Sequence, residues 1–460
     1  MVTDAIGNLD NAAAACVSDA IILGLQEHIH TDNRRKIRKI CTGLSDADIA
    51  EVLAKIDRDD AVSLIETLGK SLNADVFAIL DNDVCTAVFA QMTDNHVATI
   101  LNKMESDDAL DLIADLDDVA QQKILKTLSK KMRATLEEGL TFPEDSAGRL
   151  MQRELISIPE FWTVGKTLDF LRAAKNGIPD HFYDIMIVDP MHHVVGEVPA
   201  GRILCAPRQA KLKDLCLEHM HPIKATMDQE DVAHIFRREG LVSAPVINDD
   251  HRLIGVITID DIVGVIDEEA QEDLLKLGGI STDDIYRDVL RTTRSRFSWL
   301  AINLITAIMA SIVIALFETT LDQIVALAIL MPIVASMGGN AGTQTLTVAV
   351  RALATKELSA ANAWRVIGKE LSVGLLNGIS FAVIIGCVTW LWFSNPALGI
   401  IIAAAMMINL IVAGFFGAII PIILARYNMD PAIASSVFLT TLTDMVGFFA
   451  FLGLAAVFLV

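Results

Sequence analysis

The apolar run that ends this chain holds one carboxylate near its middle, Asp444, in the segment TTLTD at 440–444. A carboxylate near the centre of a bilayer costs about 2.5 to 3.5 kcal/mol, so such a residue usually faces a bundle interior or a water-filled path. The alternative is a protonated Asp hydrogen-bonded to a neighbouring helix. Because hard cations prefer oxygen ligands, we expect Asp444 to handle cations. Thr440 and Thr441 offer further oxygen atoms, unless their hydroxyls bond back to their own helix.

Two more positions in the apolar half are candidate ligands. Asn340 lies in GGNAG at 338–342, where glycines let another helix come close and the amide either contacts an ion or holds two helices together. Asp430 directly precedes Pro431, so it is a candidate helix cap and also a candidate ligand at a pore mouth. These residues, with Asp444 and the two threonines, form the candidate pore.

Negative charge is concentrated in the first two thirds of the chain. The 460 residues include 37 basic and 58 acidic ones, a formal net charge of -21. From Phe297 onward there are only five basic and six acidic residues, so a net charge of about -20 belongs to residues 1–296. This half should repel nucleic acid and attract cations. Its run DEEAQED at 267–273 places carboxylates where cations would relieve repulsion, although a charge run is usually only solvated surface.

Five segments of the remaining chain are long enough to cross a hydrocarbon core, which takes about 20 residues as a helix. They lie near 297–317, 324–350, 371–393, 397–425 and 432–459. Lys and Arg collect before the first segment, between the second and third, and between the fourth and fifth. The positive-inside rule then makes the N-terminus cytoplasmic and puts the C-terminus outside. We expect a multi-pass protein of the plasma (inner) membrane, in contact with lipid.

Two internal duplications organise the acidic half. Segments that start at Ile56, Leu80 and Met104 repeat every 24 residues, and each predicts a helical hairpin with acids at its caps. A second pair of copies, 184–196 and 243–255, is offset by 59 residues, and each predicts a strand, a turn and another strand. These copies resemble tandem CBS domains.

TIDD at 258–261 is similar to the Thr-x-x-Asp element with which some CBS domains hold a ribose. That similarity implies Thr258 and Asp261 as nucleotide-binding residues. ATP or another adenine nucleotide is therefore a candidate ligand of this part of the chain.

The chain resembles the MgtE family of magnesium channels over essentially its whole length. The resemblance is carried, in order, by EDSAGRLM at 144–151, PIVASMGGNAGTQ at 332–344 and TTLTDMVGF at 440–448. It implies a multidomain fold: an all-α helical-repeat domain at 1–140, α/β tandem CBS domains at 141–266, a connecting (plug) helix at 267–296 and an all-α transmembrane domain with five helices at 297–460. It also implies a homodimer whose pore is lined by the second and fifth spans.

The resemblance further implies that cytoplasmic Mg²⁺ closes the channel. The implied sensing ligands are carboxylates of the helical repeat, the CBS pair and the connecting helix: Asp107, Asp111, Asp228, Glu230, Glu239, Asp261, Glu269, Glu272 and Asp273. At low Mg²⁺ these groups would repel one another and the pore would open.

The expected function is therefore a magnesium-selective channel for Mg²⁺ uptake, closed by Mg²⁺ bound to its acidic half. The alternative is a proton-coupled or exchange carrier of Mg²⁺ or Co²⁺, which would also use an intramembrane carboxylate. An enzyme is not expected, because the chain has no P-loop, nucleophile elbow or HExxH motif.

Overall fold

The computed structural model describes residues 17–80, 82–174, 178–179, 182–280, 289–427 and 429–459. The chain forms two compact units, Met1–Asp267 and Glu268–Val460. The boundary between them falls within helix α16 (Ile259–Leu277).

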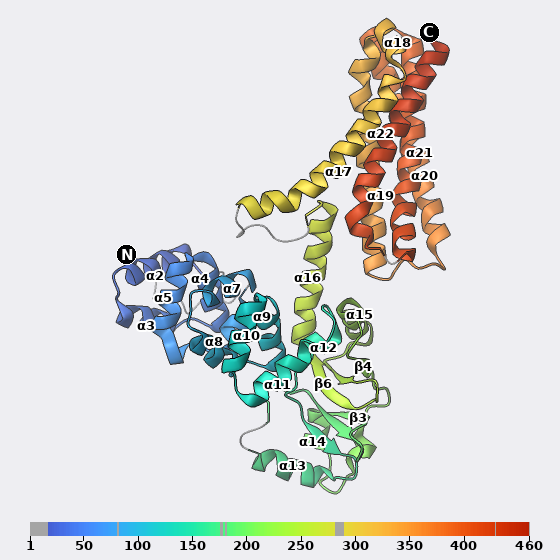
Figure 1. Ribbon diagram of the computed structural model, residues 1–460. Coiled ribbons are helices and arrows are strands. Elements are labelled where there is room, and N and C mark those ends of the chain that lie inside the picture. Colours follow the sequence, from blue (N-terminus) through green and yellow to red (C-terminus); the bar gives the residue numbers. More distant parts are fainter. Residues whose placement is uncertain are drawn as a thin grey trace. The chain divides into compact units, whose positions relative to one another are not determined.

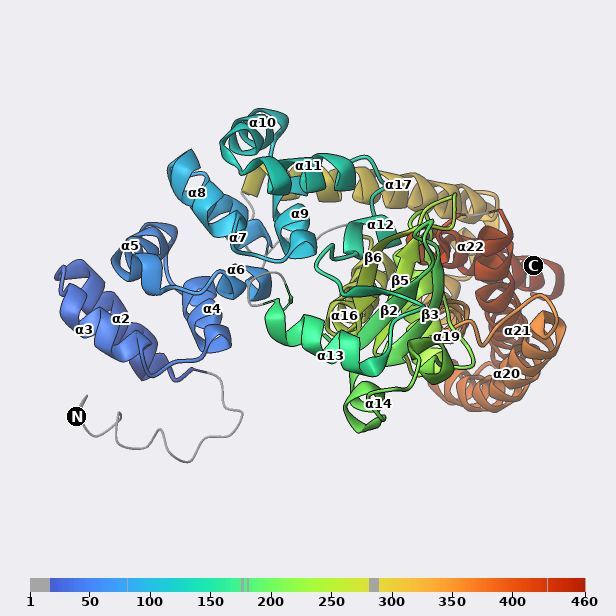
Figure 2. The same cartoon turned by 90° about the horizontal axis from the view of Figure 1, so that it is seen from below.

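Short helices form the first part of the first unit and follow one another as a row (Figures 1 and 2). Their bounds are α2 (Asp19–His30), α3 (Arg34–Cys41), α4 (Asp46–Lys55), α5 (Arg58–Leu68), the 3-10 helix η2 (Gly69–Ser71), α6 (Asp75–Ile79), α7 (Asn82–Phe89), α8 (Asp94–Leu101), α9 (Ser106–Ala114), α10 (Asp118–Thr127) and α11 (Lys130–Gly139). Helices α5, α7 and α9 begin 24 residues apart, as the repeat in the sequence predicts. Each is too short to stand alone, and together they bury one contiguous apolar core from Val17 to Leu136.

Two three-stranded sheets form the rest of the first unit. They contain β1 (Ser157–Pro159), β2 (Asp184–Val188) and β3 (Val194–Pro199) in one sheet, and β4 (Ile223–Lys224), β5 (Ser243–Ile247) and β6 (Leu253–Thr258) in the other. In each sheet the first pair of strands is parallel and the second pair is antiparallel. Asp184 lies opposite Pro199, and Ser243 opposite Thr258, so the 59-residue offset of the sequence is an offset between equivalent pairs in the structure.

Helices cover these sheets. They are α12 (Ala147–Leu150), α13 (Val164–Ala173), α14 (Ala200–Cys205), the 3-10 helix η3 (Leu212–Leu215) and α15 (Gln229–Glu239). The expected α/β pair is confirmed, and α16 continues directly from β6 of the second sheet.

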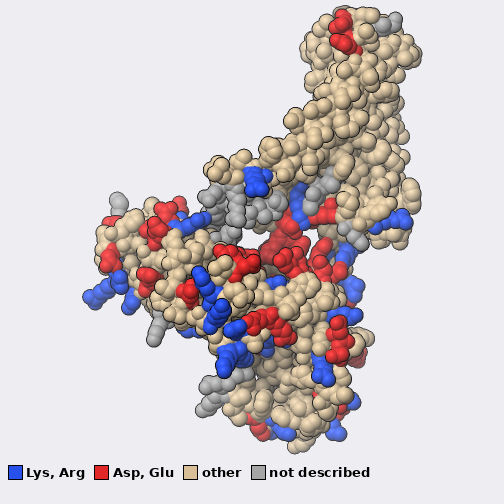
Figure 3. All heavy atoms as spheres, in the orientation of Figure 1, with Lys and Arg blue, Asp and Glu red and all other residues tan. Residues whose placement is uncertain are grey.

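Five long helices build the second unit: α17 (Val289–Ala315), α19 (Ala326–Ala354), α20 (Ala363–Phe393), α21 (Pro396–Arg426) and α22 (Pro431–Phe458), with the short α18 (Glu318–Gln323) after the first of them. Their apolar parts run for 23 to 31 residues with mean hydropathy of 1.3 to 2.4, which is enough to cross a bilayer. The expected five-helix membrane domain is confirmed. On the visible face, charged side chains gather at the two ends of this unit (Figure 3).

Glycines bring the membrane helices unusually close. A Cβ on Gly374 of α20 would lie 2.7 Å from the carbonyl oxygen of Leu410, and one on Gly399 of α21 would lie 2.7 Å from that of Gly386. Such close backbone approach is the usual way in which helices associate in lipid, where no hydrophobic effect drives them together.

The connecting helix expected over 267–296 is not one continuous helix. Helix α16 ends at Leu277, residues 281–288 lie outside the described residues, and α17 begins at Val289. Gly279 has φ of 73° and packs against the indole of Trp299. Only glycine suits both this left-handed backbone and the lack of space, so the sequence itself ends α16 here.

Candidate functional site

Asp444 lies at the middle of α22 and is half-buried. It is 14 residues beyond Asp430, or about 21 Å along a helix. One turn earlier, the hydroxyl of Thr440 donates to the carbonyl of Ser436 at 2.9 Å, and that of Thr441 to the carbonyl of Val437 at 2.6 Å. Both threonines thus donate to their own helix, and their oxygen atoms keep lone pairs for a further partner.

Helix α19 carries an exposed polar stripe made of Ser336, Asn340, Thr343 and Thr347. Their spacing of four, three and four residues puts all of them on one helix face. The amide of Asn340 donates to the Ser336 hydroxyl at 3.4 Å on the same helix. This hydrogen bond lies within α19, and the interpretation of Asn340 as a bridge between helices stays a prediction.

Asn409, which the sequence analysis did not single out, makes such a bridge. It is fully buried on α21, and its Nδ2 donates to the carbonyl of Val334 on α19 at 2.9 Å. Gly338 of α19 and Gly447 of α22 both pack directly against the same amide. One side chain thus holds three membrane helices together.

These contacts fix the relative depth of Asn340 and Asp444. Gly338 and Gly447 meet at Asn409, while Gly342 lies against the Leu439 side chain. Asn340 is midway between the two contact points on α19, and Asp444 lies between those on α22. The polar stripe of α19 and the carboxylate of α22 therefore share one level, near the middle of the membrane helices.

The end of α16 contacts the start of α22. Lys276 Nζ lies 2.7 Å from Asp430 Oδ2 and 2.6 Å from Glu272 Oε1, while Leu277 packs in a cluster with Leu346 and Ala432. Burial acts to lower the pKa of Lys276, but these two ion pairs outweigh it and raise the pKa. Burial, and then the charge of Asp430, raises the pKa of Asp273.

Asp430 also caps α22. Its Oδ1 accepts a hydrogen bond from the Ala432 amide at 2.8 Å, and Pro431 occupies the first helical position. The cap predicted from the sequence is confirmed, and one carboxylate oxygen serves the cap while the other meets Lys276.

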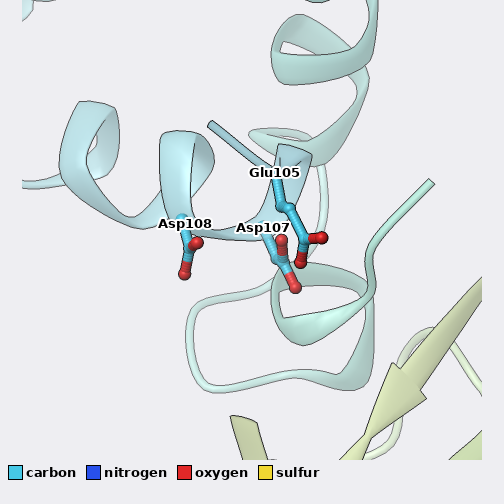
Figure 4. A group of neighbouring side chains, drawn as sticks. All are labelled: Glu105, Asp107 and Asp108. Carbon is cyan, nitrogen blue, oxygen red and sulfur yellow. The ribbon is translucent and has the colours of Figure 1, made fainter. Parts of the chain in front are cut away.

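A carboxylate cluster lies at the start of α9 in the first unit. Glu105, Asp107 and Asp108 each place an oxygen within 4.8 Å of the others (Figure 4). Asp107 is 7% exposed, and its Oδ1 has no hydrogen-bond partner among the described residues. An orphaned, buried oxygen among several carboxylates fits a hard cation such as Mg²⁺.

The raised pKa values of this cluster also fit a bound cation. Burial, and then Asp261, raises the pKa of Asp108 to about 7, and burial raises the pKa of Asp261 to about 6. The pKa of Asp107 lies well above its usual range because of burial and of the charges of Asp261, Asp108 and Glu105. The carboxylates therefore repel one another, and a bound cation would relieve that repulsion.

Neutral and charged hydrogen bonds join α9 to the α/β part next to this cluster. The Ser106 hydroxyl donates to Glu154 at 2.7 Å and accepts from the Arg153 amide at 2.8 Å. Arg153 also pairs with Glu138 at 3.0 Å. The structure thus brings together Asp107 and Asp261, which are 154 residues apart in sequence.

The two residues expected to hold a nucleotide bond to each other. The Thr258 hydroxyl donates to Asp261 Oδ2 at 2.8 Å and accepts from Gln152 at 3.3 Å. Thr258 also lines a cavity of about 20 Å³ between the sheets, with Asp184 and Ser243. This volume suits about one water molecule, so a nucleotide would have to open the cavity.

The other expected sensing residues lie elsewhere on the first unit or on α16. Asp228 caps α15 by accepting from the Glu230 amide at 2.9 Å, and Glu239 pairs with Arg238 at 2.7 Å, which lowers its pKa. Asp111 accepts from Asn82 at 2.8 Å. Glu269 is half-buried on α16.

Sequence reasoning missed residues for which a signal existed. Asp108 adjoins Asp107 in one of the repeated Asp pairs that were interpreted as helix caps, and Glu105, two residues before Asp107, was not singled out. Lys276 stands four residues after Glu272, the spacing of a helical ion pair. Asn409 is the single amide in the run 397–425.

Three parts of the chain match known protein families. Residues 331–454 match the MgtE family of divalent cation transporters, residues 44–145 the MgtE intracellular N domain, and residues 212–268 the CBS domain. The magnesium transporter MgtE of Thermus thermophilus is 30% identical over 96% of this chain and 99% of that protein. That of Bacillus subtilis is 32% identical over 70% of this chain and 71% of the relative.

A solved structure agrees with the fold of the first unit. It is the cytosolic domain of the Mg²⁺ channel MgtE in complex with ATP, with a TM-score of 0.50, 23% identity, and coverage of 53% of this chain and 99% of that domain.

Membrane-crossing helices with a carboxylate in their midst, on one chain with an acidic helical repeat and a CBS pair, define a multidomain membrane transport protein. The chain belongs to the MgtE family of magnesium transporters. It is therefore an ion transporter and not an enzyme, as its sequence predicts.

Proposed function

We propose that this chain is a magnesium-selective channel for Mg²⁺ uptake across the plasma membrane. The observation that carries the proposal is Asp444, a carboxylate at mid-membrane beside the exposed polar stripe of α19. Polar groups on the outside of a protomer do not face lipid. They face water or a second copy of the chain.

In a homodimer, the exposed polar groups of α19 and α22 would face a water-filled path and a second copy of the chain. A two-fold axis beside α19 and α22 would set the two polar stripes against each other and present Asp444 twice. Two carboxylates give a charge of about -2 along the path, which suits a divalent ion that keeps most of its water. Asn340, Thr440 and Thr441 would contact that water, and Asp430 would stand at the mouth.

The orientation follows from the connections between the helices. Basic residues cluster where α19 meets α20 and where α21 meets α22, so these ends are cytoplasmic by the positive-inside rule. The first unit, and with it the N-terminus, is then cytoplasmic, and the C-terminus lies outside.

Gating by cytoplasmic Mg²⁺ is supported by two acidic sites. The cluster of Glu105, Asp107 and Asp108 repels Asp261, and a bound cation would join the helical repeat to the CBS pair. At the end of α16, the carboxylates of Glu272 and Asp273 lie beside Asp430. We propose that Mg²⁺ at both sites favours the closed pore, with Asp111, Asp228, Glu230, Glu239 and Glu269 as further ligands by family resemblance.

A nucleotide is proposed as a second effector. Thr258 and Asp261 occupy the Thr-x-x-Asp position of the second CBS copy, in the fold of a domain that was solved with ATP in another protein. Nucleotide binding would open the cavity beside Thr258. The nucleotide would then compete with Mg²⁺ for the Asp261 carboxylate.

The test is the full chain reconstituted in planar bilayers and in liposomes. Asp444→Asn keeps the shape and removes the charge, and we expect it to lower Mg²⁺ flux at least tenfold. Asp322→Asn, an acid on α18, is the matched control and should conduct normally. Unchanged flux through Asp444→Asn would refute the proposal, and saturable flux that follows a proton gradient without unitary currents would identify a carrier instead.

A further inference from the structure

A second carboxylate is buried among the membrane helices. Glu370 lies on α20, 8% exposed, and its Oε2 accepts a hydrogen bond from the Thr345 hydroxyl of α19 at 3.3 Å. Lys369 Nζ lies 3.6 Å from Oε1, but that side chain is 71% exposed. Such a surface pair offsets little of the cost of a buried charge, so the carboxylate needs a further partner.

Glu370 lines a cavity of about 130 Å³ between α19, α20 and α21. Two amide side chains, Gln344 and Asn377, line the same cavity, with Val348, Gly374 and Gly414. A Cβ on Gly414 would lie 2.8 Å from the Glu370 carbonyl, so α20 and α21 are in backbone contact behind the cavity. Oxygen ligands from two helices thus line one pocket, in which Glu370 and Thr345 are buried and Gln344 and Asn377 stand at its exposed opening.

This cavity lies away from the candidate pore. Thr345 is five residues beyond Asn340, which rotates it by about 140° around α19. It is buried, whereas Asn340 is exposed. The cavity is therefore formed within one protomer, on the flank of α19 that faces α20 and α21, and its Gln344 lies about one turn beyond Asn340.

We propose that this cavity is a second divalent-cation site, one in each protomer. Its donors are the Glu370 carboxylate, the Thr345 hydroxyl and the amide oxygens of Gln344 and Asn377. Mg²⁺ prefers oxygen ligands, commonly uses one or two carboxylates and retains several waters. The cavity is roomy enough for an ion with part of its hydration shell.

The proposal does not depend on the pore. Glu370 belongs to α20, a helix that the proposed conduction path does not use, so the site would remain if Asp444 had no role in flux. Its occupancy would hold α19 against α20 close to the Arg351 end of the membrane unit, the end that α16 contacts through Leu277 and Leu346.

Protection of a cysteine inside the cavity tests the proposal on the full chain in detergent. Val348→Cys places a thiol at the cavity wall without removing a proposed ligand, and peptide mass spectrometry follows its alkylation by a small water-soluble reagent. At a Mg²⁺ concentration ten times the half-protecting value, alkylation should be about tenfold slower. Ser380→Cys, at an exposed position of α20 that does not line the cavity, is the control for general effects of Mg²⁺.

A second substitution in the Val348→Cys variant shows whether Mg²⁺ acts at the cavity or at the pore. Protection of Val348→Cys should survive Asp444→Ala and disappear in Glu370→Gln, with Asn377→Leu giving the same loss where Glu370→Gln folds poorly. Protection that persists in both of the latter variants, or is absent from the parent, overturns the proposal. Protection that depends on Asp444 and not on Glu370 assigns the effect to the pore and also overturns it.

Discussion

Lys276 Nζ lies 2.7 Å from Oδ2 of Asp430, so a lysine of α16 holds the carboxylate that caps the last membrane helix. The same ammonium group pairs with Glu272 at 2.6 Å. The family resemblance implies Glu272 and Asp273 as Mg²⁺ ligands, yet Lys276 of the same chain supplies part of their countercharge. The ammonium group of Lys276 therefore favours contact between α16 and the start of α22 even without bound Mg²⁺.

Replacing Lys276 with Gln should therefore weaken the contact between α16 and α22, which the proposed gating associates with the closed pore. A charge-assisted hydrogen bond contributes about 1.5 to 3 kcal/mol, and about 1.4 kcal/mol is a factor of ten in an equilibrium. We expect the open probability at low Mg²⁺ to rise at least tenfold in single-channel recordings, with a higher Mg²⁺ concentration needed to restore closure. Lys276→Arg keeps the charge and should behave like the parent; equal open probabilities for Gln and Lys would disprove the role.

The acidic cluster of α9 gives a second prediction, for Asp107→Asn. Removing this buried charge relieves its repulsion with Asp261 and Asp108, so α9 should stay docked without a cation. Hydrogen exchange of the full chain would show this locally. In the parent, Mg²⁺ should slow exchange of peptides from α9, whereas in Asp107→Asn exchange should already be slow and change little on adding Mg²⁺.

The helical repeat supplies its own control for that experiment. Asp59 is 48 residues before Asp107, at the equivalent position two repeats earlier, and it is exposed in the first turn of α5. Asp59→Asn should respond to Mg²⁺ like the parent. An undiminished Mg²⁺ effect on α9 in Asp107→Asn would show that the cluster is not the sensor.

A third prediction concerns pH and Glu197 of β3. Glu197 is 3% exposed, and its Oε2 has no partner among the described residues. Burial, and then the charge of Asp184, raises its pKa to about 7. The folded state therefore keeps a proton that the unfolded state loses near pH 4.5, so stability falls as pH rises through that window and levels off above about 7.

Urea unfolding in detergent would measure this loss. Trp162 is half-buried beside the first CBS core, whereas the other four tryptophans lie on α17 and α20 of the membrane unit, so Trp162 fluorescence reports the first unit. Glu197→Gln should flatten the pH dependence, by up to about 3 kcal/mol between pH 5 and pH 8. Glu218→Gln, at an exposed site, should leave it unchanged, and a parent whose stability rises over this range would contradict the assignment.

Hydropathy predicts the membrane helices, but it does not predict which charged residues are buried between them. The start of α20 was expected near 371, and the helix begins at Ala363, because Arg365, Lys369 and Glu370 lower the local hydropathy without breaking the helix. Glu370 was thus counted with a loop, although it is buried. Charge and helix propensity are separate properties, and only packing reveals which charges are enclosed.

Contacts between residues far apart in the sequence could not be predicted, for a related reason. Asp107 and Asp261 were both named, but only by family resemblance, because nothing in spacing or composition joins residues 154 positions apart. Asn409 stands out as an amide in an apolar run, yet its partner, the Val334 carbonyl, is a backbone atom that no side-chain pattern marks. The repeat in residues 56–116, in contrast, was predictable because each helix contacts its neighbours in sequence.

The packing around Asn409 gives the last prediction, for which two adjacent glycines form a matched pair. Gly338 packs directly against the Asn409 amide, whereas a Cβ on Gly339 would meet nothing within 4 Å. Gly338→Ala should displace the amide and cost about 1 to 3 kcal/mol, as overpacking does, while Gly339→Ala should be neutral. Thermal melting of the detergent-purified chain, read by size-exclusion chromatography, should fall by several degrees only for Gly338→Ala. Because Asn409 also sets the depth of α22 against α19, Mg²⁺ flux should fall in the same variant, and equal behaviour of the two alanine variants would show that Asn409 does not organise the pore helices.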